Sequence, residues 1–244
     1  MRTLKVIDLF CGCGGFSLGF DYAGFEIIYA LDKWEIACRS YKANFPHVDV
    51  HCEDALNVDP KDIPNCDIII GSPPCQDHSV ANHKRTHDTS LINWFWEIVR
   101  KKKPKYVIME ETPLARDYLP PDVPKVRIYR MSDFGVPQLR RRLFAGDFPE
   151  PKKQPVDVIF PTVLASEYRR GWKTSRGGLS KVFRRRSLIP EAKIVQTFPL
   201  DYVVYGTLEE QYAQIGNAVP PLMAYKLAEA IMLVEEGFLE VEWW

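Results

Sequence analysis

The chain has 244 residues, of which 46% are hydrophobic and 26% are charged. This composition is typical of a globular protein with one sizeable core and at most two domains, and the balance of 32 basic and 32 acidic side chains excludes an intrinsically disordered chain. No apolar run reaches the roughly 18 residues that a membrane span needs. Asp8 lies inside the first apolar stretch, which is therefore not typical of a signal peptide, and we expect a cytoplasmic protein.

Short apolar runs alternate with helical patterns along the first half of the chain. The expected strands cover 4–10, 26–31, 67–71 and 106–109, and the expected helices cover 16–23, 34–44 and 90–102. This alternation predicts an α/β fold, with a mostly parallel sheet covered by helices on both faces. We also expect a late hairpin from 126–130 and 142–146, and a C-terminal helix over 219–236 with two prolines in its first turn.

The net charge of zero hides a basic stretch. Residues 139–186 hold 13 basic and 4 acidic side chains, so this stretch has a net charge of +9. Residues 149–186 are also rich in proline and are expected to form a loop-rich lobe or arm. The charge alone fits either a phosphate-binding surface or an ordinary solvated face.

A glycine loop directly follows the first expected strand. The loop reads Gly12-Cys13-Gly14-Gly15, and Asp32 ends the second strand 20 residues after Gly12, where an acid could hold a ribose hydroxyl. The spacing departs from G-x-G-x-x-G, so a pyrophosphate site is not supported. The pattern favours a nucleoside cofactor, although glycine turns at this position are also common as plain structural turns.

The six cysteines lie at positions 11, 13, 38, 52, 66 and 75, without a C-x-x-C pair, so neither a disulfide framework nor a metal site is expected. Most are expected to be buried. Cys75 differs because Pro73 and Pro74 fix it at the end of the 67–71 strand, among polar neighbours, as a nucleophile would require. Glu110 and Glu111 follow the next strand, and strand alternation predicts that at most one of them faces the same cleft.

Together these segments resemble cytosine-C5 DNA methyltransferases. DLFCGCGGFSLGF, GSPPCQ, a glutamate at the next strand end, GVPQLRRRLF and QIGNAVPP occur in that family's order, between about residues 5 and 232. The resemblance implies a Rossmann-like methyltransferase fold that binds S-adenosylmethionine and releases S-adenosylhomocysteine. It implies a catalytic domain formed by 1–148 and 187–244, with 149–186 as a reduced target-recognition region.

Site residues follow from the same resemblance. The implied cofactor residues are Phe10, Gly12, Gly14, Asp32, Asp54, Asn217 and Val219. The implied catalytic residues are the nucleophile Cys75, the acid Glu110, and Arg140 and Arg142 of the QxRxR motif. The candidate DNA contacts are Gln76, Ser79, Gln138, Arg169, Arg170 and Arg184. Thiolate addition at C6, assisted by Glu110 at ring N3, would activate C5 of a cytosine flipped out of double-stranded DNA.

Three departures from the family pattern keep alternatives open. The family's Glu-Asn-Val is Glu110-Glu111-Thr112 here, only 12 residues join this motif to the next strand, and the target-recognition region is nearly absent. We therefore expect a short target or a partner protein for recognition, with no membrane association. The favoured reading is an active enzyme of a prokaryotic or viral restriction-modification system. An RNA cytosine methyltransferase and a methyltransferase-like regulatory subunit without activity are the alternatives.

Overall fold

The fold is built on one seven-stranded sheet. The computed structural model describes residues 2–74, 88–168, 179–184 and 186–238. The strands are β1 (Lys5–Leu9), β2 (Glu26–Asp32), β3 (Asp49–Cys52), β4 (Ile68–Gly71), β5 (Tyr106–Glu111), β6 (Val126–Arg130) and β7 (Arg141–Asp147). Their order across the sheet is β3-β2-β1-β4-β5-β7-β6, and β7 is antiparallel to both of its neighbours. The remaining strand pairs are parallel, so the mostly parallel sheet and the late hairpin are confirmed.

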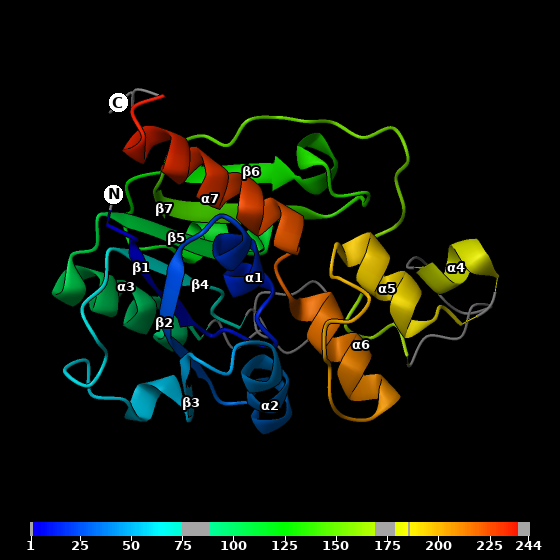
Figure 1. The fold of residues 1–244 in the computed structure, drawn as a ribbon, viewed down its shortest axis with the longest axis horizontal. Coiled ribbons are helices and arrows are strands. Elements are labelled where there is room, and N and C mark those ends of the chain that lie inside the picture. Colours follow the sequence, from blue (N-terminus) through cyan, green and yellow to red (C-terminus); the bar gives the residue numbers. More distant parts are fainter. Residues whose placement is uncertain (1, 75–87, 169–178, 185, 239–244) are drawn as a thin grey trace.

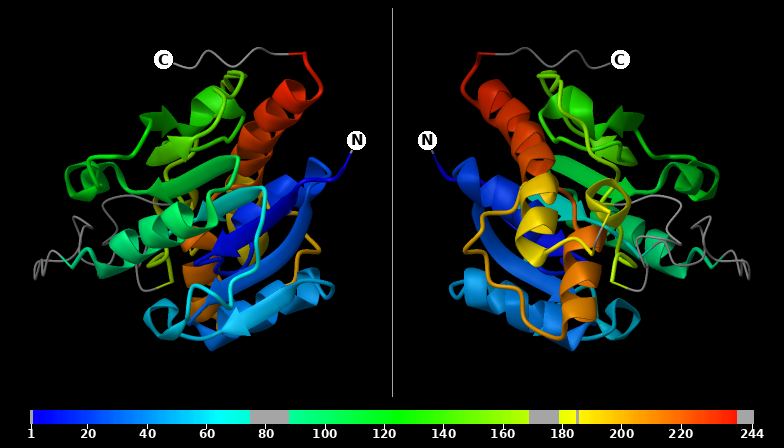
Figure 2. Two further views of the ribbon diagram at one scale, coloured as in Figure 1. Left: turned by 90° about the vertical axis from the view of Figure 1, so that its left-hand side faces the viewer. Right: turned by 90° about the vertical axis from the view of Figure 1, so that its right-hand side faces the viewer.

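The helices cover both faces of this sheet (Figures 1 and 2). They are α1 (Gly15–Tyr22), α2 (Glu35–Asn44), α3 (Ser90–Lys102), α4 (Leu179–Phe183), α5 (Ile189–Gln196), α6 (Leu208–Asn217) and α7 (Pro221–Glu235), with short 3-10 turns η1 (Ala55–Asn57), η2 (Pro113–Tyr118) and η3 (Met131–Phe134). Two apolar cores result, one on each face. The larger core packs α1, α2 and α7 on one face, and the smaller core packs α3 and η1 on the other.

Sequence patterns predicted the main elements but missed one strand, β3, and three helices, α4, α5 and α6. Strand β3 carries one aliphatic residue, Val50, between polar neighbours at the sheet edge, so it lacks the apolar run of the inner strands. Helices α5 and α6 contact each other and lie on the right-hand side of Figure 1, beside α4. A sequence signal for α6 was present, because Thr207 and Glu210 form a capping box at its start.

Residues 149–168 of the basic stretch run along the main body of the fold. The backbone N–H groups of Gln154 and Val156 donate to Asp133 and Ser132, and Leu139 donates to Phe160. Val163 is completely buried in the larger core. The described residues from 149 to 168 therefore pack against the same sheet and helices that form the rest of the fold.

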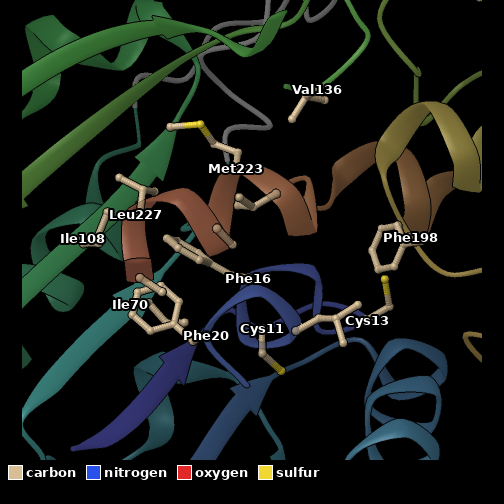
Figure 3. Packing of buried hydrophobic residues seen from close by; sticks show 14 of the residues in the cluster. Cys11, Cys13, Phe16, Phe20, Ile70, Ile108, Val136, Phe198, Met223 and Leu227 are labelled. Atoms are coloured by element: carbon tan, nitrogen blue, oxygen red, sulfur yellow. The ribbon is translucent and has the colours of Figure 1, made fainter. Parts of the chain in front are cut away.

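Close packing of α1 on α7 joins the two ends of the chain. A Cβ atom built at Gly19 would overlap the backbone nitrogen of Tyr225 and the side chain of Ala224. Figure 3 shows the neighbouring contacts, with Phe16 and Phe20 of α1 directed toward Met223 and Leu227 of α7.

We expect Gly19→Ala to destabilise the protein by about 1–3 kcal/mol, because α7 must move to admit one methyl group into a filled interface. Urea denaturation would measure the change. The control is Asp21→Ala on the exposed side of α1, for which we expect a change within about 0.5 kcal/mol. Equal stability of both variants would contradict the assigned packing of α1 on α7.

Candidate active site

One large cavity lies where the parallel strands end. Its volume is about 1020 Å³, and it is lined by residues that follow β1, β2, β4 and β5 and by residues between α6 and α7. Ligands of open α/β sheets bind at this edge because the strand ends leave a crevice between the loops that follow them. The cavity therefore brings together segments from the first third, the middle and the end of the chain.

The glycine loop forms one wall of the cavity. Phe10 and Gly12 both line it and both have positive φ angles, 63° and 54°. Phe10 is one of few non-glycine residues held in this region, and its ring packs edge-on against Trp94 with the ring centroids 5.6 Å apart. Gly14, which was expected to bind the cofactor, does not line the cavity. At φ 95° it starts α1, and a Cβ there would lie 2.7 Å from the Tyr202 hydroxyl.

Asp32 fastens the glycine loop to the end of β2. One of its carboxylate oxygens accepts a 2.8 Å hydrogen bond from the Gly12 N–H, and the other accepts one of 2.8 Å from the Trp34 N–H. Burial raises the pKa of Asp32, while these two hydrogen bonds lower it. Asp54 lines the same cavity, caps η1 through the Leu56 N–H, and lies 3.6 Å from Lys33 Nζ.

Sequence reasoning missed a buried acid on the floor of the cavity. Asp8 is 1% exposed and accepts a 2.6 Å hydrogen bond from Ser17, whose hydroxyl also lies 2.7 Å from that of Tyr41. Its second oxygen, Oδ1, is buried and has no hydrogen-bond partner among the described residues. Burial raises the pKa of Asp8 to about 7. The signal was visible in the sequence as a single acid within the apolar first strand.

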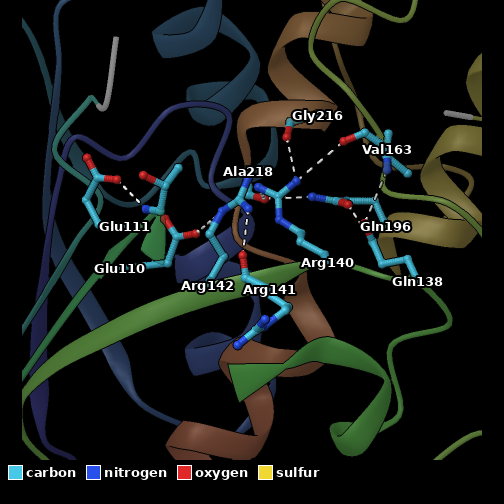
Figure 4. Close-up of polar contacts among 11 residues, drawn as sticks. Glu110, Glu111, Gln138, Arg140, Arg141, Arg142, Val163, Gln196, Gly216 and Ala218 are labelled. Carbon is cyan, nitrogen blue, oxygen red and sulfur yellow. Dashed lines mark hydrogen bonds and ion pairs between the residues drawn. The ribbon is translucent and has the colours of Figure 1, made fainter. Parts of the chain in front are cut away.

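Glu110 and Arg142 form a buried ion pair at the opposite wall (Figure 4). Arg142 Nε lies 2.9 Å from Glu110 Oε1, and the Glu110 side chain is only 6% exposed. The two residues come from adjacent antiparallel strands, β5 and β7, which hold both side chains at the strand ends. Arg142 also donates a 2.8 Å hydrogen bond to the Arg141 carbonyl, which fixes the direction of its guanidinium.

The expectation that at most one of the two adjacent glutamates faces the cleft is wrong. Strand β5 continues through Glu111, and both carboxyl groups line the cavity. Alternation does send the two side chains in different directions, but the cavity extends around the end of the strand and reaches both. Glu111 is 2% exposed and accepts a hydrogen bond from the Thr112 N–H.

Two residues of the QxRxR motif are structural in this arrangement. Arg140 is 1% exposed and lies outside the cavity lining, and its guanidinium donates to the carbonyls of Gly216 at 2.8 Å and Ala218 at 3.2 Å. It therefore holds the backbone on both sides of Asn217. Gln138 is completely buried and bonds to Gln196 and Val195, so its assignment as a DNA contact is corrected: no face of it is open to a ligand.

The remaining expected site residues fall into three groups. Asn217 and Val219 line the cavity, as do Pro73 and Pro74, the residues just before Cys75. Arg184 is exposed and follows α4, away from the cavity lining. The others lie outside the described residues: Cys75, Gln76, Ser79, Arg169 and Arg170. Within the described ranges, no group of three His, Cys, Asp or Glu side chains could hold a metal ion, and no helix is long and apolar enough to cross a membrane.

Comparisons with known proteins agree on one family. The model of the C-5 cytosine-specific DNA methylase family matches residues 4–114 and 152–233. The type II methyltransferase M.HgiDI of Herpetosiphon aurantiacus is 32% identical, with 93% of this chain and 94% of the relative covered. The type II methyltransferase M1.HphI of Haemophilus parahaemolyticus is 28% identical, with coverage of 94% and 87%.

Solved structures agree on the fold. The Entamoeba histolytica methyltransferase EhMeth superposes with a TM-score of 0.71 at 18% identity, over 98% of this chain and 100% of that one. The S. pombe Dnmt2 methyltransferase superposes with a TM-score of 0.68 at 14% identity, over 96% and 100%. The family match covers most of the chain, and the sheet order, glycine loop and Glu110–Arg142 pair are consistent with it. The chain belongs to the C-5 cytosine-specific DNA methylase family.

Proposed function

We propose that this protein transfers a methyl group from S-adenosylmethionine to C5 of a cytosine flipped out of double-stranded DNA. The observation that carries this proposal is that the glycine loop and the Glu110–Arg142 pair open into one cavity. A donor held at the loop and a base held at the ion pair would then be neighbours. A volume of about 1020 Å³ lies at the upper end of the range for ligand pockets, roughly 300–1000 Å³, and so leaves room for a cofactor and a base beside it.

The donor set fits a cationic nucleoside cofactor. The cavity lining holds six carboxyl groups, those of Asp8, Asp32, Glu53, Asp54, Glu110 and Glu111, against two cations, Lys33 and Arg142. Burial raises the pKa of Asp8 to about 7 and that of Glu111 to about 8, so these two carry little negative charge, but four carboxylates still face two cations. This excess of acids favours a positively charged ligand. Phe10 offers a ring face for an adenine, Asp32 an acceptor for ribose hydroxyls, and Asn217 and Val219 would close the cavity. S-adenosylmethionine would supply the methyl group on a positively charged sulfonium.

The chain's own residues would perform the remaining chemistry. Cytosine C5 is a poor nucleophile until a thiolate adds at C6, and Cys75 is our candidate for that addition. Ring N3 would take up a proton as the addition places electrons on the ring, and the Glu110 carboxylate would accept a hydrogen bond from that N3–H and so stabilise the intermediate. Arg142 keeps Glu110 in place and has further donors for the base carbonyl. Loss of the C5 proton and expulsion of the Cys75 thiolate would restore the aromatic ring.

We also propose that the chain reads little DNA sequence by itself. The alignment with M.HgiDI spans 301 positions, more than this chain contains, so that relative carries segments that are absent here. The family model leaves residues 115–151 unmatched. Between residues 149 and 168, backbone hydrogen bonds attach the chain to the rest of the fold. The 152–154 segment exposes only Lys152, Lys153 and Gln154 as polar side chains. A short or degenerate target, or a partner protein that recognises the target, follows from this arrangement.

The first test is methyl transfer itself. We expect tritium from labelled S-adenosylmethionine to enter DNA rather than RNA, and Cys75→Ala to reduce the rate by at least about 1000-fold, because the covalent route is lost. The matched control is Cys52→Ala, an exposed cysteine outside the cavity lining, which we expect to keep its rate within about twofold. Transfer to RNA alone would favour the RNA enzyme, and no transfer with cofactor still bound would favour a regulatory subunit.

The second test concerns cofactor binding. S-adenosylmethionine should raise the melting temperature, since it binds only the folded cavity. Asp32→Asn should shrink this shift by weakening affinity about tenfold, or about 1.4 kcal/mol, because the amide is a poorer acceptor for ribose and for the Gly12 N–H. Glu110→Gln should leave the shift unchanged. Equal losses in both variants would show that the cofactor has been placed at the wrong wall.

The third test concerns the target. Bisulfite sequencing of DNA methylated by the purified protein should show a short or degenerate site, with activity that falls steeply as salt rises. Each good base contact contributes about 1–3 kcal/mol of discrimination, and the exposed side chains of the 152–154 segment supply too few for a long site. Methylation confined to one strict site of four or more base pairs, without a partner, would contradict the proposal.

A further inference from the structure

Two carboxyl groups lie at the end of β5, and the Arg142 guanidinium pairs with only one of them, Glu110. The side chains of Glu110 and Arg142 are 6% and 20% exposed, and Glu111 as a residue is 2% exposed. Arg142 Nε lies 2.9 Å from Glu110 Oε1, so the positive charge is already paired. A second buried carboxylate beside this pair would be left without compensation, which is among the most costly arrangements in a protein interior.

Among the residues that the structure describes, none compensates such a charge on Glu111. One of its oxygens accepts the Thr112 N–H, and the other, Oε1, is buried and has no hydrogen-bond partner among the described residues. In Figure 4, the Glu111 carboxyl group lies on the far side of Glu110 from Arg142. A neutral carboxylic acid satisfies these conditions, since it needs no counter-ion and carries one proton to donate into the cavity that it lines.

We propose that Glu111 is a positioning residue that works only while it carries a proton. A neutral Glu111 does not compete for the Arg142 guanidinium, so Arg142 stays paired with Glu110. This pairing keeps the Glu110 carboxyl group directed toward the base site. When Glu111 ionises, two negative groups compete for one cation and the pair loses its geometry. This inference rests on the proposed function, because the base site is where Glu110 would act.

The charged groups around Glu111 agree with a retained proton. Burial raises the pKa of Glu111 to about 8, and the Glu110 charge also raises it. The Thr112 N–H, the Thr112 hydroxyl and, least of all, Arg142 lower it. The neighbouring strand β4 ends in uncharged Ile70 and Gly71. The following turn, η2, carries Arg116 and Asp117, and both are exposed to solvent, where water screens them. The other charged residues of the cavity lining are Asp8, Asp32, Lys33, Glu53 and Asp54, which together are negative.

The first experiment is a pH profile of methyl transfer at saturating cofactor, between about pH 6 and 9.5. The wild type should lose activity above about pH 8, where Glu111 ionises. Glu111→Gln keeps the shape and the donor without the charge, so it should retain at least about a third of the neutral rate and lose the alkaline fall. Glu111→Ala should be reduced by about tenfold or more at every pH. The control Glu97→Gln, an exposed carboxylate on α3, should keep the wild-type profile.

The second experiment measures the same proton without catalysis. The raised pKa means that folded Glu111 keeps its proton up to about pH 8, whereas Glu111 in the unfolded chain releases it above about pH 4.5. The free energy of unfolding therefore falls as the pH rises from about 4.5 to about 8. Glu111→Gln removes that fall. The melting temperature of Glu111→Gln relative to the wild type should therefore increase between about pH 5 and 8.5, while that of Glu97→Gln should stay constant.

These outcomes separate the inference from the proposed function. If the wild type transfers no methyl group, the proposed function fails and the melting temperatures alone decide whether Glu111 holds a proton. A melting-temperature difference that does not change with pH would show that Glu111 is ionised throughout and overturn the inference. An alkaline fall that is identical in the wild type and in Glu111→Gln would overturn it as well.

Discussion

The guanidinium of Arg140 connects the parts of the chain that must meet for the cavity to exist. It comes from the start of β7, is 1% exposed, and donates to the carbonyls of Gly216 and Ala218, more than 70 residues further along the chain. These carbonyls flank Asn217, which lines the cavity. Backbone carbonyls inside a protein need donors, and one planar side chain with several N–H groups serves two of them here. The wall formed by Asn217 and Val219 therefore depends on a residue that does not itself line the cavity.

The cavity and its surroundings have opposite electrostatic characters. Six carboxyl groups line the cavity against two cations, whereas the stretch from 139 to 186 has a net charge of +9. In the proposed function, a cationic cofactor and an anionic polymer would place opposite demands on the protein. The carboxyl groups of the cavity would face the cofactor, and the basic stretch would face DNA phosphates. The net charge of zero therefore hides a local excess of acids in the cavity and a local excess of bases in residues 139–186.

Sequence patterns predicted the fold because the inner strands and α3 have clear apolar periods with polar or proline boundaries. They also identified the segments that line the cavity, since parallel strands end at the same edge of a sheet. What they could not predict was the direction of individual side chains. Gln138 and Arg140 belong to the same motif as Arg142, yet only Arg142 lines the cavity. Gln138 is buried against α5, and Arg140 is buried against the residues that join α6 to α7. Strand alternation placed Glu111 on the face opposite to Glu110. That rule holds within a strand, but the cavity lies at the end of β5, where both side chains can reach it.

The contacts between the glycine loop and the C-terminal third have a consequence for synthesis of the chain. The backbone carbonyl of Cys13 accepts from the Tyr202 hydroxyl, and the Cys13 thiol lies 3.6 Å from the Gln214 carbonyl, a separation of 201 residues. Helix α1 completes its packing only when α7 is present. Contacts this distant in sequence close late and slowly, because loop-closure entropy is lost before they form. A nascent chain leaving the ribosome thus holds its glycine loop unfinished until Tyr202 and Gln214 have been made, and the cavity that this loop lines cannot form earlier.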